Sequence, residues 1–136
     1  MMFAICDIEN DKHIGNARLS QIDWVHRVAL YGRLIGPAEY RGSGYGTDAL
    51  IQLLRFGFHH IGLNRIWSAA VTDNEISLGS NDKVGMTREG ILRQFCFING
   101  EFVDVVALSM LREDFDAVHG TPAEWKAKRI KISNES

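Results

Sequence analysis

The residues best suited to chemistry are the glycines of the stretch Arg41–Gly46, which reads Arg-Gly-Ser-Gly-Tyr-Gly. Glycine at alternate positions leaves backbone N–H groups uncovered and allows positive φ angles that larger residues avoid. Where such a loop opens a helix, the unpaired N–H groups of the first turn and the helix dipole favour an anion, most commonly a phosphate. The same spacing also suits a tight turn from strand to helix that binds nothing, so the loop alone leaves both interpretations open.

The loop is expected to lie between an apolar strand and the strongest helical pattern of the chain. Val28–Ile35 predicts the strand, and it must stop or splay at Pro37, because proline has no N–H to continue a ladder. From Tyr45 to Ile61 apolar residues recur at helical spacing and predict one amphipathic helix, with Gly62 as its C-cap. The glycines would therefore sit at the entrance of a long helix.

The remaining elements are expected to build one sheet around this strand and helix. Short polar turns before the loop favour an antiparallel meander, and the strands on either side of the long helix should run parallel because the helix is a crossover. The other predicted elements are strands at Met2–Ile8, His13–Ile22 and Arg65–Val71, a helix at Glu75–Val84, a hairpin of Gly90–Ile98 and Phe102–Leu111 around Asn99-Gly100, and a helical turn or two at Glu113–Val118.

Length and composition are those of one ordinary globular domain. The chain has 136 residues, of which 46% are hydrophobic and 24% charged, with a net charge of −2. It has no dense basic block, so nucleic acid is not an expected partner, and no signal peptide or membrane span is expected. Cys6 and Cys96 lie in apolar runs, which predicts buried free thiols of a reducing compartment, by default the cytoplasm.

Several short motifs of the sequence occur in the order and spacing of one known family. The stretch Arg41–Gly46 fits the pattern Gln/Arg-x-x-Gly-x-Gly/Ala at the start of a long helix, which is diagnostic of the GNAT superfamily of acetyl-CoA-dependent N-acetyltransferases. The chain resembles the branch that acts on ribosomal-protein N-termini, spermidine and other small amines, over about Phe3 to Phe115. The matching segments and positions are Glu39–Leu50, Gly62–Ile66, Asn74, Gly85, Glu89–Arg93, Gly100, Asp104 and Leu111–Glu113.

This resemblance implies both a fold and an activity. The fold would be α/β (α+β), with a mixed, mostly antiparallel sheet, a splayed central parallel pair and flanking helices, in one domain at 1–118 followed by a tail at 119–136. The activity would be transfer of an acetyl group from acetyl-CoA to a primary amine by direct attack, the acceptor being a small amine, a polyamine or a protein N-terminus. A catalytically impaired acyl-CoA-binding or regulatory module of the same fold is the alternative.

The resemblance also implies where the cofactor lies. In the family the pantetheine arm follows the strand before the glycine loop, where that strand splays from its parallel neighbour, and the loop holds the pyrophosphate. Asn74 matches an asparagine that hydrogen-bonds this arm, but it could also cap the following helix. Arg41 could face a phosphate or simply be solvated. The residues implied to bind the cofactor are Leu34, Ile35, Gly36, Arg41, Gly42, Ser43, Gly44, Tyr45, Gly46, Thr47 and Asn74.

One departure from the family concerns the leaving group. The family often places a tyrosine seven residues after the Asn74 position, as the acid for the departing thiolate, and this chain has Asn81 there. An amide can donate a hydrogen bond but cannot act as a proton acid, so the adjacent Ser80 or a water is the expected substitute. A thiolate with a pKa of about 8.5 is a tolerable leaving group, so the reaction would be slower rather than forbidden.

A second departure lies at the N-terminus. The family begins with a strand and two helices, whereas this chain begins at what resembles the family's second strand. Apolar residues of the first strands would then be bare, and patches of that size rarely stay exposed. We therefore expect a homodimer or a higher homo-oligomer.

The general base has several candidates. Glu39 lies between the splayed strand and the loop, although it could be a solvated turn carboxylate, and His26 lies in a turn. Asp104 stands among apolar residues of a strand, where a carboxylate must be paired or functional, so it should bind a cationic amine or pair with Arg93. The predicted catalytic residues are Glu39, Ser80 and Asn81, and no metal is predicted.

Overall fold

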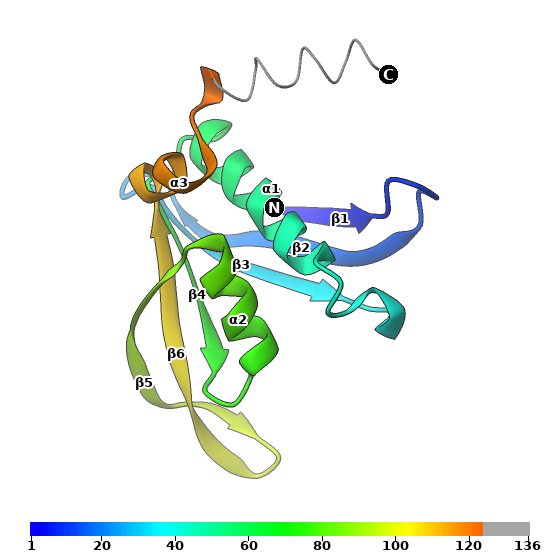
Figure 1. Ribbon diagram of the computed structural model, residues 1–136. Helices are drawn as coiled ribbons and strands as arrows, with labels where there is room; N and C mark the ends of the chain where they lie inside the picture. Colours follow the sequence, from blue (N-terminus) through cyan, green and yellow to red (C-terminus); the bar gives the residue numbers. More distant parts are fainter. Residues whose placement is uncertain (124–136) are drawn as a thin grey trace.

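The computed structural model describes residues 1–123 of the 136-residue chain, in the order of elements shown in Figure 1. The predicted tail at 119–136 therefore falls mostly outside the described residues. The elements are β1 (Met2–Cys6), β2 (His13–Asp23), β3 (Val28–Ile35), a 3-10 turn (Ala38–Tyr40), α1 (Tyr45–His59), β4 (Arg65–Val71), α2 (Glu75–Val84), β5 (Thr87–Ile98), β6 (Glu101–Leu111) and α3 (Arg112–His119).

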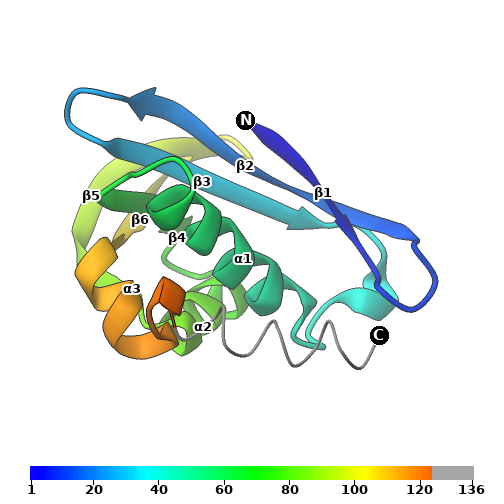
Figure 2. The same cartoon turned by 90° about the horizontal axis from the view of Figure 1, so that it is seen from above.

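The six strands form one twisted sheet in the order β1-β2-β3-β4-β6-β5. All neighbours are antiparallel except β3 and β4, which run parallel because α1 carries the chain across between them. Figure 2 shows the three helices on the same side of the sheet, with the β1–β2–β3 half curving over them. This architecture confirms the predicted mixed, mostly antiparallel sheet with a central parallel pair.

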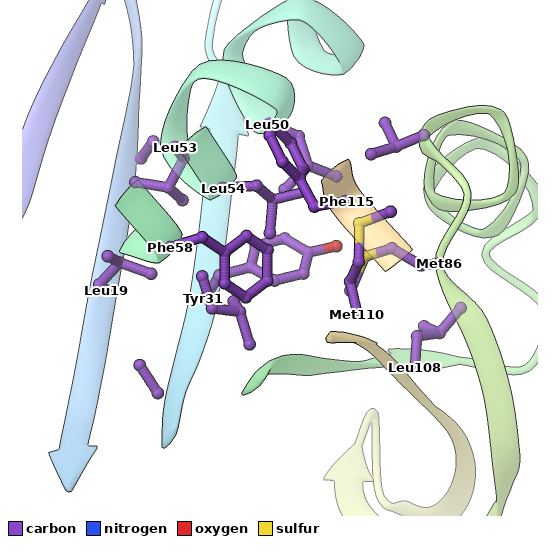
Figure 3. Packing of buried hydrophobic residues seen from close by; sticks show 14 of the residues in the cluster. Leu19, Tyr31, Leu50, Leu53, Leu54, Phe58, Met86, Leu108, Met110 and Phe115 are labelled. Carbon is purple, nitrogen blue, oxygen red and sulfur yellow. The ribbon is translucent and has the colours of Figure 1, made fainter. Parts of the chain in front are cut away.

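The core lies between α1 and the sheet. Leu50, Leu54 and Phe58 follow the helical period predicted for α1 and are fully buried, and they meet Leu19 of β2 and Phe115 of α3. Figure 3 shows these side chains around the ring of Tyr31, with Met86 and Met110 near its hydroxyl end. Burial of this one stripe fixes α1, and with it the loop at its N-terminus, against β3.

The parallel pair diverges almost as soon as it forms. Only Val28, Ala29 and Leu30 of β3 pair with β4, and beyond Leu30 the two strands separate. β3 ends at Ile35, just before Pro37 as predicted, but its pairing with β4 ends earlier, at Leu30, so Pro37 does not account for the separation of the strands. Beyond Leu30 the two strands leave a cavity between them in place of a continuous ladder.

Most predicted elements have the expected bounds. The strands at Val28–Ile35 and Arg65–Val71 and the helix at Glu75–Val84 match to the residue, and α1 ends two residues before the predicted Ile61. Asn99 and Gly100 have φ angles of 51° and 81°, so the hairpin between β5 and β6 has the turn that these two residues favour. Within residues 1–123, none of the helices combines the length and apolar character required to cross a bilayer.

The two cysteines are free thiols, but the prediction that both are buried was wrong. Cys6 is exposed and Cys96 is half-buried. Both lie on the two outermost strands of the sheet, β1 and β5, where alternate residues face solvent instead of a second layer. An apolar run therefore did not guarantee burial at either edge.

A pair of glycine substitutions tests the packing of α1 on the sheet. A Cβ on Gly57 of α1 would lie 2.5 Å from Cδ1 of Ile66, whereas a Cβ on Gly79 of α2 would meet nothing within 4 Å. Gly79→Ala should stabilise the protein by up to about 1 kcal/mol through helix propensity. Gly57→Ala should be less favourable than Gly79→Ala by about 1–3 kcal/mol, because the added methyl overpacks the core.

Urea denaturation of both variants beside the wild type measures the difference in the free energy of unfolding. Equal effects of the two substitutions would show that α1 is not seated on β4 as described.

Candidate functional site: a glycine cradle beside a cleft in the sheet

A cavity of about 440 Å³ opens where β3 and β4 diverge, and we call it the β3–β4 cleft. Its walls come from Tyr31, Gly32 and Arg33 of β3 and from Trp67, Ser68 and Ala69 of β4, and Ser77 of α2 also lines it. The hydroxyl of Ser68 donates to the backbone oxygen of Tyr31 over 3.1 Å, beyond the last paired residues of the two strands. The cleft thus begins where a side chain replaces the regular ladder.

The loop Arg41–Gly46 forms an open cradle at the start of α1, and we call it the glycine cradle. Gly42 and Gly44 have φ angles of 75° and 90°, and a Cβ on either glycine would meet nothing within 4 Å. The first backbone hydrogen bond of α1 runs from the Asp48 N–H to the Gly44 oxygen, over 2.9 Å. The N–H groups of Tyr45, Gly46 and Thr47 therefore precede the helical ladder, in the arrangement that favours an anion.

Two arginines hold the cradle from behind. The Arg33 guanidinium donates to the Gly46 oxygen from inside the sheet, and burial lowers its pKa. Arg41 turns back to the end of β3, where it donates to the oxygens of Ile35 and Gly36 over 3.1 and 2.6 Å. Both side chains thus tie the loop to β3, and Arg33 also lines the β3–β4 cleft.

Tyr31 and Asn81 meet between the sheet and α2. Their side chains are 5% and 1% exposed, and the Tyr31 hydroxyl donates to Oδ1 of Asn81. Burial raises the pKa of Tyr31, while the nearby Arg33 charge acts in the opposite direction. The ring is therefore neutral and carries its proton at physiological pH.

The polar residues predicted on α1 and α2 lie at the first turn of α1 and along α2. Oγ1 of Thr47 and Oγ of Ser80 share a hydrogen bond of 2.8 Å, which joins the first turn of α1 to α2. Asn74 is the N-cap of α2, and its Oδ1 accepts from the Ser77 N–H over 3.2 Å. The cap leaves the Asn74 amide nitrogen available for a second partner, so the two roles considered for this residue are compatible.

The carboxylates proposed as bases lie elsewhere. Glu39 is exposed on the 3-10 turn, 3.5 Å from the Lys12 ammonium, and it does not line the β3–β4 cleft. A hydrogen bond from its own backbone N–H, followed by the Lys12 charge, lowers its pKa, which makes it a weaker base. Asp104 does not pair with Arg93 as expected, because its Oδ1 accepts the Gln94 N–H over 2.8 Å where β5 bulges.

A second cavity, of about 500 Å³, lies between β1 and α1. It is lined mainly by apolar residues, with the buried Asp7 and the ring of Tyr45 at one end, and the Asp7 charge raises the Tyr45 pKa. The Tyr45 side chain thus faces away from the β3–β4 cleft and packs edge-on against Tyr40 at 4.9 Å. No glycine of the cradle lines either cavity, but Arg33 lines the β3–β4 cleft and donates to Gly46 of the cradle, so this cleft is the better candidate site.

Sequence reasoning missed two residues of the site, Tyr31 and Arg33. Both lie on the face of β3 that also carries the buried Ala29, two residues apart. The alternation of the strand places this tyrosine and this arginine on its buried face. Because buried polar groups need partners, the alternation alone could have marked both residues as candidates for a polar site. Their partners, Asn81 and Gly46, are far along the chain and carry no such signal.

Comparison with known proteins agrees with this geometry. Residues 1–87 match the acetyltransferase (GNAT) domain. The spermidine N(1)-acetyltransferase of Escherichia coli K12 is 30% identical over 123 residues, which are 90% of this chain and 64% of that protein. The uncharacterized prophage-derived N-acetyltransferase YokL of Bacillus subtilis is 27% identical over 119 residues, covering 87% of this chain and 67% of the relative.

Solved structures give the same result. A chimera of the spermidine N-acetyltransferase SpeG from Vibrio cholerae superposes with a TM-score of 0.79 at 26% identity, over 84% of this chain and 68% of the other. A probable acetyltransferase superposes with a TM-score of 0.72 at 31% identity, over 76% and 58%. The chain thus spans about two thirds of the length of such relatives. On its sequence, its sheet and its glycine cradle, the chain belongs to the GNAT acetyltransferase family.

Proposed function

We propose that the protein transfers an acetyl group from acetyl-CoA to a primary amine. The observation that carries this proposal is the meeting of two features: an open glycine cradle at the N-terminus of α1 and the β3–β4 cleft beside it. Arg33 contributes to both, since it lines the cleft and binds Gly46. A ligand with a phosphate at one end and a reactive group at the other would span them.

The donor set of the cradle suits the pyrophosphate of CoA. The N–H groups of residues 42–46 would hold it, with the dipole of α1 favouring the negative charge. The open space in front of Gly42 and Gly44 is the room that a phosphate needs for close approach to the backbone. The Arg33 guanidinium behind Gly46 and the hydroxyl of Thr47 in the first turn add favourable polarity.

The exposed backbone of β3 suits the pantetheine arm. Along a strand, successive residues turn their N–H and C=O groups to opposite sides, and the Tyr31 oxygen faces β4 because it accepts from Ser68. Arg33 and Ile35 share that direction, and although the Ile35 oxygen accepts from Arg41, the Ile35 N–H faces the cleft side of β3. Gly36 gives its N–H to Ile14 and its oxygen to Arg41. Of the predicted residues Leu34, Ile35 and Gly36, Ile35 is thus the best placed, together with Arg33.

The reaction needs a deprotonated amine and a stabilised oxyanion. When bound, acetyl-CoA supplies an acetyl group activated as a thioester. An alkylamine has a pKa of about 10.4, so it must lose a proton before attack, and water in the open cleft is the proposed acceptor. Backbone N–H groups of β3 that have no strand partner would stabilise the developing negative charge on the carbonyl oxygen. The hydrogen bond between Thr47 and Ser80 would hold the first turn of α1 against the middle of α2 beside the arm.

The names of the relatives support the proposed acceptor class. Several are spermidine N-acetyltransferases, and one is the putative ribosomal N-acetyltransferase YdaF of Bacillus subtilis. A small amine, a polyamine or a protein N-terminus is therefore the proposed acceptor, and the cytoplasm is the proposed location. The second candidate, an acyl-CoA-binding module without turnover, is favoured only by Asn81, which stands where the family often has a tyrosine.

We also propose that the protein forms a homodimer, and an exposed aromatic surface supports this. Phe97 of β5 and Phe102 of β6 are 65% and 64% exposed, and their rings pack on each other at 4.9 Å. Phe95, on the same outermost strand, is 56% exposed. Figure 1 shows this end of the hairpin extending away from the helices. Exposed apolar clusters next to a free strand edge are typical of association surfaces.

A matched pair of leucine substitutions tests the cradle. Gly44→Leu should abolish the thermal stabilisation by CoA and the release of thiol from acetyl-CoA with a panel of amines, because the side chain fills the cradle. Gly100→Leu introduces the same left-handed strain, of about 1–3 kcal/mol, in a turn remote from the cradle, and should keep both signals. A Gly44→Leu variant with wild-type stabilisation by CoA would refute the cradle assignment.

Two substitutions separate the cap role of Asn74 from a role in binding. Asn74→Ala should cost about 1 kcal/mol of unfolding free energy, whereas Asn74→Ser should keep the cap. Both variants lack the amide donor, so both should bind CoA about 3- to 10-fold more weakly in calorimetric titrations. If Asn74→Ser binds CoA like the wild type, the residue acts only as a cap.

Sedimentation tests the association surface. The wild type should sediment as a dimer at micromolar concentration, and Phe97→Glu combined with Phe102→Glu should give a monomer, because charges would be buried without partners. Ile8→Glu is the control, since Ile8 is 95% exposed in the turn between β1 and β2, on the side of the sheet opposite to β5. A wild-type monomer, or dissociation caused by the Ile8 change, would contradict the proposal.

A further inference from the structure

We propose that Tyr31 is the proton donor for the leaving thiolate, with Asn81 as its positioning residue. This inference rests on the proposed function. It assigns to a strand residue the part that related enzymes give to a tyrosine on the helix after the Asn74 position. The side chain at that helical position, Asn81, is in direct contact with the Tyr31 hydroxyl. The Tyr31 phenol therefore lies beside the position where the family often has a tyrosine, but it extends from β3 instead of α2.

The position of Tyr31 follows from the divergence of the strands. It is the first residue of β3 beyond the last pair, Leu30 with Trp67, and so it stands at the apex of the β3–β4 cleft, which it lines. Its ring packs on the core beside Phe58, and Figure 3 shows the hydroxyl directed toward Met86, which lies between α2 and β5. The ring is therefore held rigidly while its polar end faces the gap between the sheet and α2.

Within residues 1–123, three polar side chains influence the ionisation of the Tyr31 hydroxyl: Asn81 on α2, Arg33 on β3 and Ser68 on β4. Burial keeps the phenol protonated, and the Arg33 charge favours the phenolate that forms for a moment when the proton leaves. At rest, Oδ1 of Asn81 accepts a hydrogen bond from the Tyr31 hydroxyl. If the Asn81 amide turns, its Nδ2 can instead donate a hydrogen bond to the phenol oxygen. That rotation would release the hydroxyl proton toward sulfur.

The proton balance of the step is as follows. The amine nitrogen forms a bond to the acetyl carbon and loses one proton to water, and the carbon–sulfur bond breaks with its electron pair going to sulfur. Tyr31 gives its hydroxyl proton to that sulfur, so the thiol of CoA leaves, and the phenolate then recovers a proton from water in the cleft. An amine and a thioester thus become an amide and a thiol, with no other reactant.

The test compares Tyr31→Phe with Tyr40→Phe. The second variant also removes a tyrosine hydroxyl, one that contacts Asn10 outside the β3–β4 cleft. The first readout is the ultraviolet titration of the thiol of bound CoA, which needs no turnover. A hydrogen bond from Tyr31 to the thiolate should lower the pKa of that thiol, and Tyr31→Phe should raise it by about one pKa unit, while Tyr40→Phe leaves it unchanged.

The second readout is steady-state kinetics with acetyl-CoA. Tyr31→Phe should lower kcat by about 100-fold with little change in the KM for acetyl-CoA, since the hydroxyl acts on the departing sulfur. An unchanged thiol pKa together with a kcat within about twofold of the wild type would overturn the role of Tyr31. A shifted thiol pKa without turnover of any amine would support Tyr31 at the sulfur and refute acetyl transfer, so the two failures are distinguishable.

Discussion

The constraint on which the structure depends is the early separation of β3 from β4. Only three residues of each strand pair, and beyond them every backbone group on the open side of β3 needs another partner. Ser68 bridges the apex by donating to Tyr31, and Arg41 closes the far end by donating to Ile35. The cleft between these two contacts is stable because side chains satisfy its ends, while its middle keeps the polar groups that a ligand would use.

The helix side of the same gap is held by contacts over long distances in the sequence. Tyr31 and Asn81 join β3 to α2, Thr47 and Ser80 join α1 to α2, and Arg33 joins β3 to the cradle. Each is a hydrogen bond made in a half-buried or buried setting, where an unpaired partner would be costly. Loss of pairing in the sheet is thus offset by a polar layer that also fixes the first turn of α1 beside the middle of α2.

These contacts explain how far sequence reasoning could go. Local signals were sufficient for the elements: alternation predicted Val28–Ile35, and helical spacing with an Asn74 cap predicted Glu75–Val84. They failed where a long-range partner decides the outcome. Asp104 was expected beside Arg93, but a bulge in β5 brings the Gln94 N–H to it instead. Asn81 could be recognised as a departure from the family, but its contact with Tyr31 could not be inferred from spacing.

The two arginines near the cradle show the same limit in electrostatic terms. Arg41 belongs to the motif and was considered as a phosphate ligand, yet it donates to the end of β3. Arg33 lies outside the motif and donates to Gly46 from inside the sheet. Both bind carbonyl oxygens, which neutralises the negative ends of backbone dipoles around the loop. The N–H groups of the cradle then dominate its field, and an anion would be bound by backbone geometry with the arginines as its support.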